Sequence, residues 1–242
     1  MNTGFYKDLD TNFEAAFELS EKEYSQDELI ELLKNGNIPQ KQIAALKLET
    51  LRNTDEAEIL IGNLTGCDGK IREAVALKIN ELLRQDSKYI NYFSAFPEFF
   101  AAATIDINGN ICRLAADSAC ILKPDFNFGQ GYVKKIKEYI YEAFAALDKF
   151  IYKDKKYVIN KQLFKLYWCL EALKNYYDMV PESELKEILS RTVGEREYTI
   201  REKTAQILYE LKAGAFNDLT ERLKNDENYY VRAAFWQNVK KK

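Results

Sequence analysis

Apolar residues recur at spacings of three and four positions along nearly the whole chain, which is the pattern of amphipathic helices. Three predicted helix starts carry Ser or Thr followed three residues later by Glu, a pair that can cap the first backbone N–H groups. The three pairs are Thr11 with Glu14, Ser25 with Glu28, and Thr199 with Glu202. Ten Gly and four Pro supply fewer turns than a β-sandwich or barrel needs. The sequence therefore predicts an all-α protein.

The periodic segments predict an N-terminal helix over residues 11–23, followed by six pairs of helices. The pairs are expected at 26–34 with 39–52, 55–65 with 69–84, 88–103 with 110–122, 132–151 with 156–177, 182–192 with 198–213, and 215–224 with 227–240.

The second helix of several pairs repeats one phrase, an apolar residue, then Arg, then small residues. The Arg position is filled by Arg72, Arg113, Arg201 and Arg232, with Lys41 and Asn160 in the first and fourth pairs. Five steps cover the 191 residues from Lys41 to Arg232, a period of about 38 residues. Because one such pair cannot bury its apolar face alone, the pairs are expected to stack.

This phrase, preceded by a turn with Asp or Asn, resembles the HEAT-repeat signature. The turn residues are Asp68, Asn110 and Asp226. The resemblance implies an alpha-alpha superhelix, or solenoid, of about six HEAT-like pairs over residues 26–240, with residues 1–25 as an N-terminal capping helix of one domain spanning 1–242. It also implies that the second helices line the concave side, and that Arg72, Arg113, Arg201 and Arg232 form a structural ladder between repeats.

The chain contains no histidine, which removes the usual catalytic base and the commonest metal ligand. Its four cysteines include no C-x-x-C pair and lie among apolar neighbours, so we expect buried free thiols in a reducing compartment. The N-terminus has no apolar signal region, and no segment suits a membrane helix. The sequence therefore predicts a soluble cytoplasmic protein without a cofactor, a metal or a catalytic residue.

Charge is unevenly distributed, although the net charge is only −3. Residues 1–35 hold nine acids and three lysines, whereas residues 132–165 hold nine lysines and four acids, interleaved with tyrosines. A solvated helix face explains these lysines, and an acidic protein surface or nucleic acid would explain them as well.

The fourth pair also predicts a working surface. Lys161, Lys165 and Trp168 lie about 200° around the helix from its apolar stripe. Matching positions elsewhere include Arg84, Glu202 and Tyr209. Mixed polar residues with a few large apolar ones are typical of a binding groove, whereas packing of Trp168 against a neighbouring repeat is the alternative.

These features favour a non-enzymatic interaction scaffold that binds a protein or peptide in its concave groove. The alternative is a nucleic-acid-binding or DNA glycosylase-like protein that uses the fourth repeat. That alternative rests on the last repeat, Tyr230-Val231-Arg232-Ala233-Ala234 with Trp236, which is loosely similar to DNA alkylation-repeat proteins.

Overall fold

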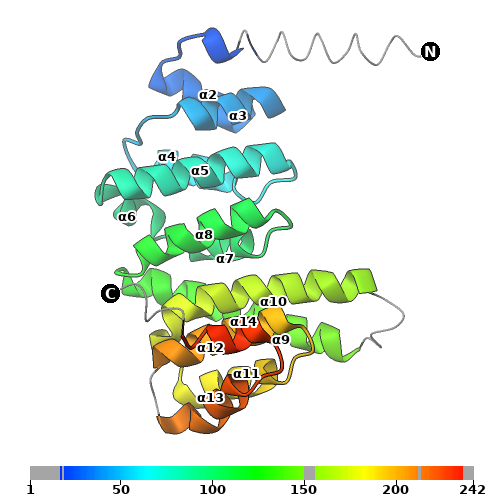
Figure 1. The fold of residues 1–242 in the computed structure, drawn as a ribbon. Coiled ribbons are helices and arrows are strands. Elements are labelled where there is room, and N and C mark those ends of the chain that lie inside the picture. Colours follow the sequence, from blue (N-terminus) through cyan, green and yellow to red (C-terminus); the bar gives the residue numbers. More distant parts are fainter. Residues whose placement is uncertain (1–16, 18, 150–155, 212–213, 237–242) are drawn as a thin grey trace, which may run out of the picture. The chain divides into compact units, whose positions relative to one another are not determined.

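The computed structural model describes residues 17, 19–149, 156–211 and 214–236, with the backbone alone for residues 156–159. Every regular element in this part of the chain is a helix, which confirms the predicted all-α class (Figure 1). Residues 11–16 and 18 of the expected first helix, and residues 237–240 of the expected last one, lie outside the described residues. None of the helices described is long and apolar enough to cross a membrane.

The chain divides into two compact units, which are described separately below. Unit 1 comprises residues 1–103 and 108–121, and unit 2 comprises residues 104–107 and 122–242. The helices of unit 1 are α2 (Gln26–Asn35), α3 (Ile38–Lys47), α4 (Thr54–Gly62), α5 (Gly69–Gln85), α6 (Lys88–Phe93), α7 (Pro97–Thr104) and α8 (Gly109–Leu122). Thr104 at the end of α7 and Leu122 at the end of α8 belong to unit 2. Unit 2 contains α9 (Phe126–Asp148), α10 (Lys156–Tyr176), η1 (Tyr177–Met179), α11 (Glu182–Val193), α12 (Tyr198–Leu211), η2 (Gly214–Phe216), α13 (Asn217–Lys224) and α14 (Tyr229–Ala233).

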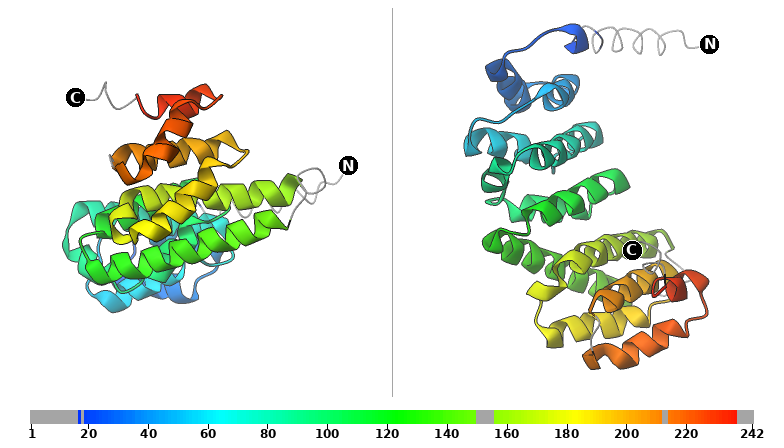
Figure 2. Two further views of the ribbon diagram at one scale, coloured as in Figure 1. Left: turned by 90° about the horizontal axis from the view of Figure 1, so that it is seen from below. Right: turned by 60° about the vertical axis from the view of Figure 1, so that its left-hand side comes forward.

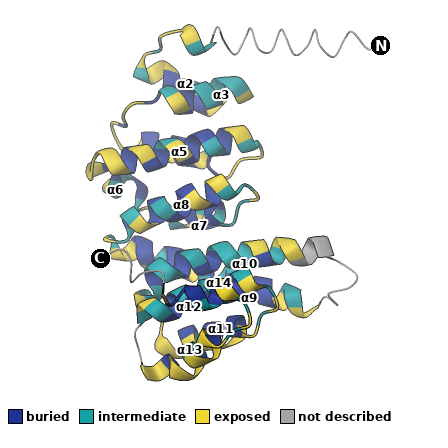
Figure 3. Cartoon of the chain, in the orientation of Figure 1, coloured by how far each residue is buried: buried dark blue, intermediate teal, exposed yellow. Residues whose placement is uncertain are grey.

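Within each unit the helices form two layers. In unit 1, α3 packs against α5 and α2 against α4 (Figure 2). Asn80 of α5 donates to the hydroxyl of Ser118 of α8 at 3.0 Å, so α8 extends the layer of α3 and α5. In unit 2, α10, α12 and α14 are successive neighbours, and α11 packs against α13. Buried positions gather on the helix sides that face other helices (Figure 3), as the predicted apolar stripes require.

Side-chain capping agrees with the prediction at one start and differs at another. Ser25 accepts from the Glu28 backbone N–H at 3.3 Å, and the Glu28 carboxylate accepts from the Ser25 N–H at 2.8 Å, which confirms this capping box. The box predicted at Thr199 is wrong, because α12 already begins at Tyr198 and Glu197 accepts from the Thr199 N–H. The Thr11 box lies outside the described residues.

Two predicted helices are interrupted by specific contacts. The helix expected over 39–52 ends at Lys47, because the following extended segment bonds to Tyr89. The Tyr89 hydroxyl lies 2.8 Å from the Thr50 hydroxyl and accepts from the Leu51 N–H at 3.4 Å. The helix expected over 88–103 is divided into α6 and α7 at Pro97, whose ring nitrogen has no hydrogen to donate.

The expectation that all four thiols are buried is wrong for two of them. Cys112 and Cys169 are buried, whereas Cys67 and Cys120 are exposed, and all four are free. Cys67 lies in the turn before α5. Cys120 lies on the exposed side of α8, although its neighbours Ala119 and Leu122 are buried. Apolar neighbours in sequence therefore do not place these two thiols in the core.

Gly36, between α2 and α3, occupies a position where a side chain does not fit. A Cβ there would lie 2.5 Å from the Leu32 carbonyl oxygen, a backbone atom that cannot move aside alone. We expect Gly36→Ala to lower the free energy of unfolding by about 2 kcal/mol, measured by urea denaturation. Gly62→Ala is the control, because a Cβ at Gly62 would meet nothing within 4 Å. If both variants unfold alike, this steric account is wrong.

Candidate functional site

Three of the predicted ladder arginines bind the turn that precedes their own helix in the same way. In each, one guanidinium nitrogen donates to the carbonyl oxygens of the residues five and six positions earlier, at 2.5–2.9 Å. These arginines are Arg72, Arg201 and Arg232. Each guanidinium thus closes its turn with several bonds at once, as its planar fork allows.

Arg201 also reaches the next turn of unit 2. It donates to the two carboxylate oxygens of Asp226 at 2.7 and 3.1 Å, and both side chains are about nine-tenths buried. Burial opposes ionisation of Asp226, but the bonds from Arg201 and from the Asn228 N–H outweigh it and lower the pKa of this carboxyl. The bonds that Arg201 donates to Asp226, opposed by burial, raise the pKa of Arg201. The pair is therefore ionised and joins two successive turns.

Arg113 does not occupy the equivalent position. The Asn108 carbonyl accepts from the Cys112 N–H at 3.1 Å, as the Asp68 carbonyl accepts from the Arg72 N–H at 3.2 Å. Cys112, which is buried, therefore stands in the Arg position of α8, and Arg113 lies one residue further round the helix. Arg113 is exposed, and it makes no hydrogen bond or ion pair with the described part of the chain.

The clearest candidate site of unit 2 is a cleft of about 480 Å³ between α10 and the start of α12, which we call the aromatic cleft. It is lined by Asn160, Leu163, Phe164, Tyr167, Trp168, Glu197 and Thr199. The Trp168 ring meets Phe164 and Tyr167 edge to face, at centroid distances of 6.3 and 5.4 Å. The indole Nε1–H of Trp168 is buried and has no hydrogen-bond partner among the described residues.

The two lysines expected beside Trp168 do not line this cleft. Lys165 extends toward α9, where its Nζ lies 2.7 Å from the Glu142 carboxylate and 4.5 Å from the centre of the Tyr139 ring. Lys161 is exposed. The ionisable group that lines the cleft is instead the carboxylate of Glu197, in the turn just before α12.

The other predicted binding residues do not join the aromatic cleft. Tyr209 lines a separate cleft of about 350 Å³ in unit 2, together with Trp236. Glu202 accepts a 3.4 Å bond from Gln206 of its own helix. Arg84 belongs to unit 1, where it donates to Asn80 at 2.9 Å.

An ion-pair network lies next to the aromatic cleft. Lys203 of α12 contacts the Glu171 carboxylate of α10, which also accepts from Lys174 at 2.8 Å, and Lys203 lies 4.8 Å from the centre of the Tyr167 ring. Burial alone would raise the pKa of Glu171, but the two lysines lower it. Burial would lower the pKa of Lys203, yet its bond to Glu171 raises it. This network therefore fixes α12 against α10.

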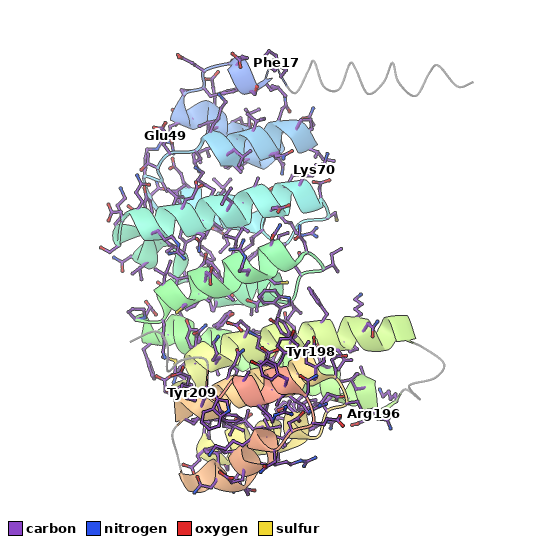
Figure 4. The ribbon with its side chains drawn as sticks, in the orientation of Figure 1. Phe17, Glu49, Lys70, Arg196, Tyr198 and Tyr209 are labelled. Carbon is purple, nitrogen blue, oxygen red and sulfur yellow. The ribbon has the colours of Figure 1, made fainter. Side chains whose placement is uncertain are left out.

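Sequence reasoning missed three exposed tyrosines beside the aromatic cleft, Tyr198, Tyr229 and Tyr230, which we call the tyrosine row. The Tyr198 and Tyr230 rings lie 6.1 Å apart, and the Tyr229 and Tyr230 rings 5.6 Å apart. Figure 4 labels Tyr198 where α12 begins and Tyr209 toward the other end of that helix. A tyrosine stands three residues before both Arg201 and Arg232, a repeat that the sequence shows once those arginines are aligned.

Several lysines of residues 132–165 are neutralised by carboxylates. Lys135 pairs with Glu138 and Lys137 with Glu184, each at 2.7 Å, in addition to the Lys165 pair. Glu184 lies outside the segment, so its pairing with Lys137 lowers the positive charge below what the composition of the segment indicates.

Comparisons with known proteins concern the fold alone. No protein-family model and no curated protein matches the chain. The crystal structure of an engineered protein from the Northeast Structural Genomics Consortium is similar with a TM-score of 0.53 and 14% identity, covering 91% of this chain and 100% of its own. A second engineered protein from the same consortium has a TM-score of 0.47 at 14% identity, covering 89% of this chain and 96% of its own.

The buried ion pairs predict how stability depends on pH. Asp226 and Glu171 have lowered pKa values in the folded chain, so their stabilisation is present above their ordinary values of 3.8 and 4.5 and is lost as the pH falls through the lowered ones. The Lys203 contribution is present below its ordinary value of 10.5 and is lost as the pH rises through its raised one. Urea midpoints should therefore be flat from about pH 6 to 8 and fall in acid. A steep change between pH 6 and 8 would contradict this.

Proposed function

We propose that this protein is a non-enzymatic interaction scaffold, built as a HEAT-like solenoid, that binds a segment of another protein in the aromatic cleft. The observation that carries the proposal is the cleft itself, whose walls are the rings of Phe164, Tyr167 and Trp168. Its volume of about 480 Å³ lies within the range of about 300–1,000 Å³ typical of ligand sites. Clefts with aromatic walls are where interfaces concentrate binding energy.

The repeat geometry supports the HEAT-like part of this proposal. Arg72, Arg201 and Arg232 close their turns by the same pair of bonds, and the second helices of each unit are neighbours. In such a stack, the exposed side of the second helices forms a surface for partners. The four free thiols support a reducing compartment, and we place the protein in the cytoplasm.

The aromatic cleft favours a protein partner over nucleic acid. A general nucleic-acid site needs lysines and arginines along its walls, because neutralised phosphates supply most of the affinity. Here the ionisable carboxylate that lines the cleft is Glu197, and Lys165 is engaged with Glu142. A phosphate backbone close to the cleft would meet negative charge.

Phe164→Glu provides a direct test, because Phe164 lines the cleft and is 38% exposed, so the change should not unfold unit 2. The immobilised protein is incubated with nuclease-treated lysate of its source organism, and captured polypeptides are quantified by mass spectrometry. Capture should fall at least about tenfold. The control is Ser190→Glu at an exposed position of α11 away from the cleft. Equal capture by both variants, or capture that occurs from untreated lysate and is lost from nuclease-treated lysate, would contradict the proposal.

A further inference from the structure

We propose that the aromatic cleft receives the side chain of an arginine in an extended, basic segment of the partner. This inference rests on the proposed function and specifies its ligand. It begins from the composition of the cleft, in which Phe164, Tyr167 and Trp168 supply flat aromatic walls and Glu197 supplies a carboxylate. Aromatic faces attract cations, and a carboxylate holds a guanidinium through two parallel bonds.

Glu197 is available for such a partner. Its carboxylate accepts from the Thr199 N–H and hydroxyl at 3.5 and 3.3 Å, both long for hydrogen bonds. It forms no ion pair with the described part of the chain, whereas the nearby Glu171 and Asp226 are paired with Lys203 and Arg201. Glu197 is the charged residue among those that line the cleft, and Arg201 acts on it only from beyond ion-pair distance. The cleft is therefore complemented by a cation.

Other occupants fit this chemistry less well. An acidic side chain would be repelled by Glu197, and an apolar one would remove water from this carboxylate without replacing the lost hydrogen bonds. A guanidinium is planar and weakly hydrated, so it can stack on the face of one ring while it bonds to Glu197. The cleft therefore matches an arginine better than a leucine or a glutamate.

The tyrosine row extends the same chemistry along unit 2. Tyr229 and Tyr230 are 66% and 56% exposed, and the Glu227 side chain in the turn before them is 91% exposed. Glu227 lies 3.7 Å from Arg201, which is already held by Asp226 at 2.7 Å. Exposed rings beside a carboxylate suit a second basic residue of the same segment. An extended segment places every second side chain on one face. One such segment of the partner can therefore contact both the aromatic cleft and the tyrosine row.

The indole N–H of Trp168 provides the readout. The chain has two tryptophans and therefore two indole signals in a ¹H–¹⁵N correlation spectrum, which Trp236→Phe assigns. The probe is a short blocked peptide with a central arginine between glycines and prolines. The matched probes carry citrulline, which has the same shape without the charge, or norleucine at the same position.

We expect the arginine peptide to shift the Trp168 signal and to bind about tenfold more tightly than the citrulline peptide. Glu197→Gln should abolish this preference. Glu210→Gln, at an exposed position of α12, should retain it. Circular dichroism and thermal unfolding of both variants verify that unit 2 remains folded.

Three outcomes would overturn the inference. If citrulline or norleucine binds as tightly as arginine, or if Glu197→Gln keeps the preference, the cleft does not recognise a cation, although Phe164-dependent capture can still support the proposed function. If no peptide moves the Trp168 signal while capture depends on Phe164, the partner is a protein of other chemistry. If 7-methylguanosine or single-stranded DNA moves the signal and the peptides do not, the occupant is a nucleobase, and the proposed function fails as well.

Discussion

Replacing Asp226 by alanine should lower the free energy of unfolding of unit 2 by about 3 kcal/mol or more, the largest effect expected for one residue. The change leaves the Arg201 guanidinium buried without its carboxylate, and breaking a buried ion pair typically costs about 3–5 kcal/mol. It also removes the acceptor of the Asn228 N–H at 2.8 Å, at the start of α14. Hydrogen exchange should therefore increase in α12 and α14 more than in α2 or α3.

The control is Glu227→Ala in the same turn. Glu227 is 91% exposed and lies 3.7 Å from Arg201, so its loss should change the free energy of unfolding by less than about 0.5 kcal/mol. Urea denaturation of both variants measures the difference. If Asp226→Ala is no more destabilising than Glu227→Ala, Arg201 does not depend on Asp226, and the account of the turn is wrong.

Trp168→Ala should weaken capture of the partner at least about tenfold while helix content is retained. Trp168 supplies a wall of the aromatic cleft, and truncating a central aromatic residue of an interface often costs about 2 kcal/mol or more. Trp236→Ala is the matched control, because Trp236 lines the other cleft of unit 2. If Trp168→Ala unfolds unit 2, the residue is part of the core and the binding assignment is wrong.

Trp168→Phe separates packing from hydrogen bonding at the same position. The Trp168 Nε1–H is buried and has no partner among the described residues, so removing it should stabilise the protein. This gain should be about equal to the packing energy lost with the smaller phenylalanine ring. The free energy of unfolding of Trp168→Phe should therefore lie within about 1 kcal/mol of wild type in urea. A loss comparable to that of a large core truncation would show that the indole N–H has a partner in solution.

The sequence predicts the helical class and most helix positions, because helix periodicity and capping are local properties. The Ser25 box shows this, since all its partners lie within four residues. The early end of α3 could not be predicted, because it depends on Tyr89, 38 and 39 positions away from its partners Leu51 and Thr50. The error at Arg113 arose from aligning the Arg itself. The phrase Asn108-Gly109-Asn110-Ile111 matches Asp68-Gly69-Lys70-Ile71 and gives the register that the structure shows.

The candidate site was predicted in part, for a similar reason. Helical phase alone places Trp168 away from the apolar stripe of its helix, and the structure places it on the wall of a cleft. The direction of Lys165 depends on Glu142 and Tyr139 of α9, and Glu197 reaches the cleft from the turn before α12. These tertiary contacts are absent from the phase of a single helix. They place a carboxylate in the cleft, where helical phase predicted two lysines.

Site-specific photo-crosslinking from position 164 identifies what occupies the aromatic cleft. A photoreactive phenylalanine analogue replaces Phe164 in the aromatic cleft or, as the control, Ser190 on α11, and the crosslinked products formed in the source organism are mapped by mass spectrometry. We expect position 164, and not position 190, to form adducts with one defined segment of another polypeptide, and this segment to contain arginine. Adducts from position 164 with nucleic acid, with this chain alone, or with the same polypeptides as position 190 would contradict the proposed function.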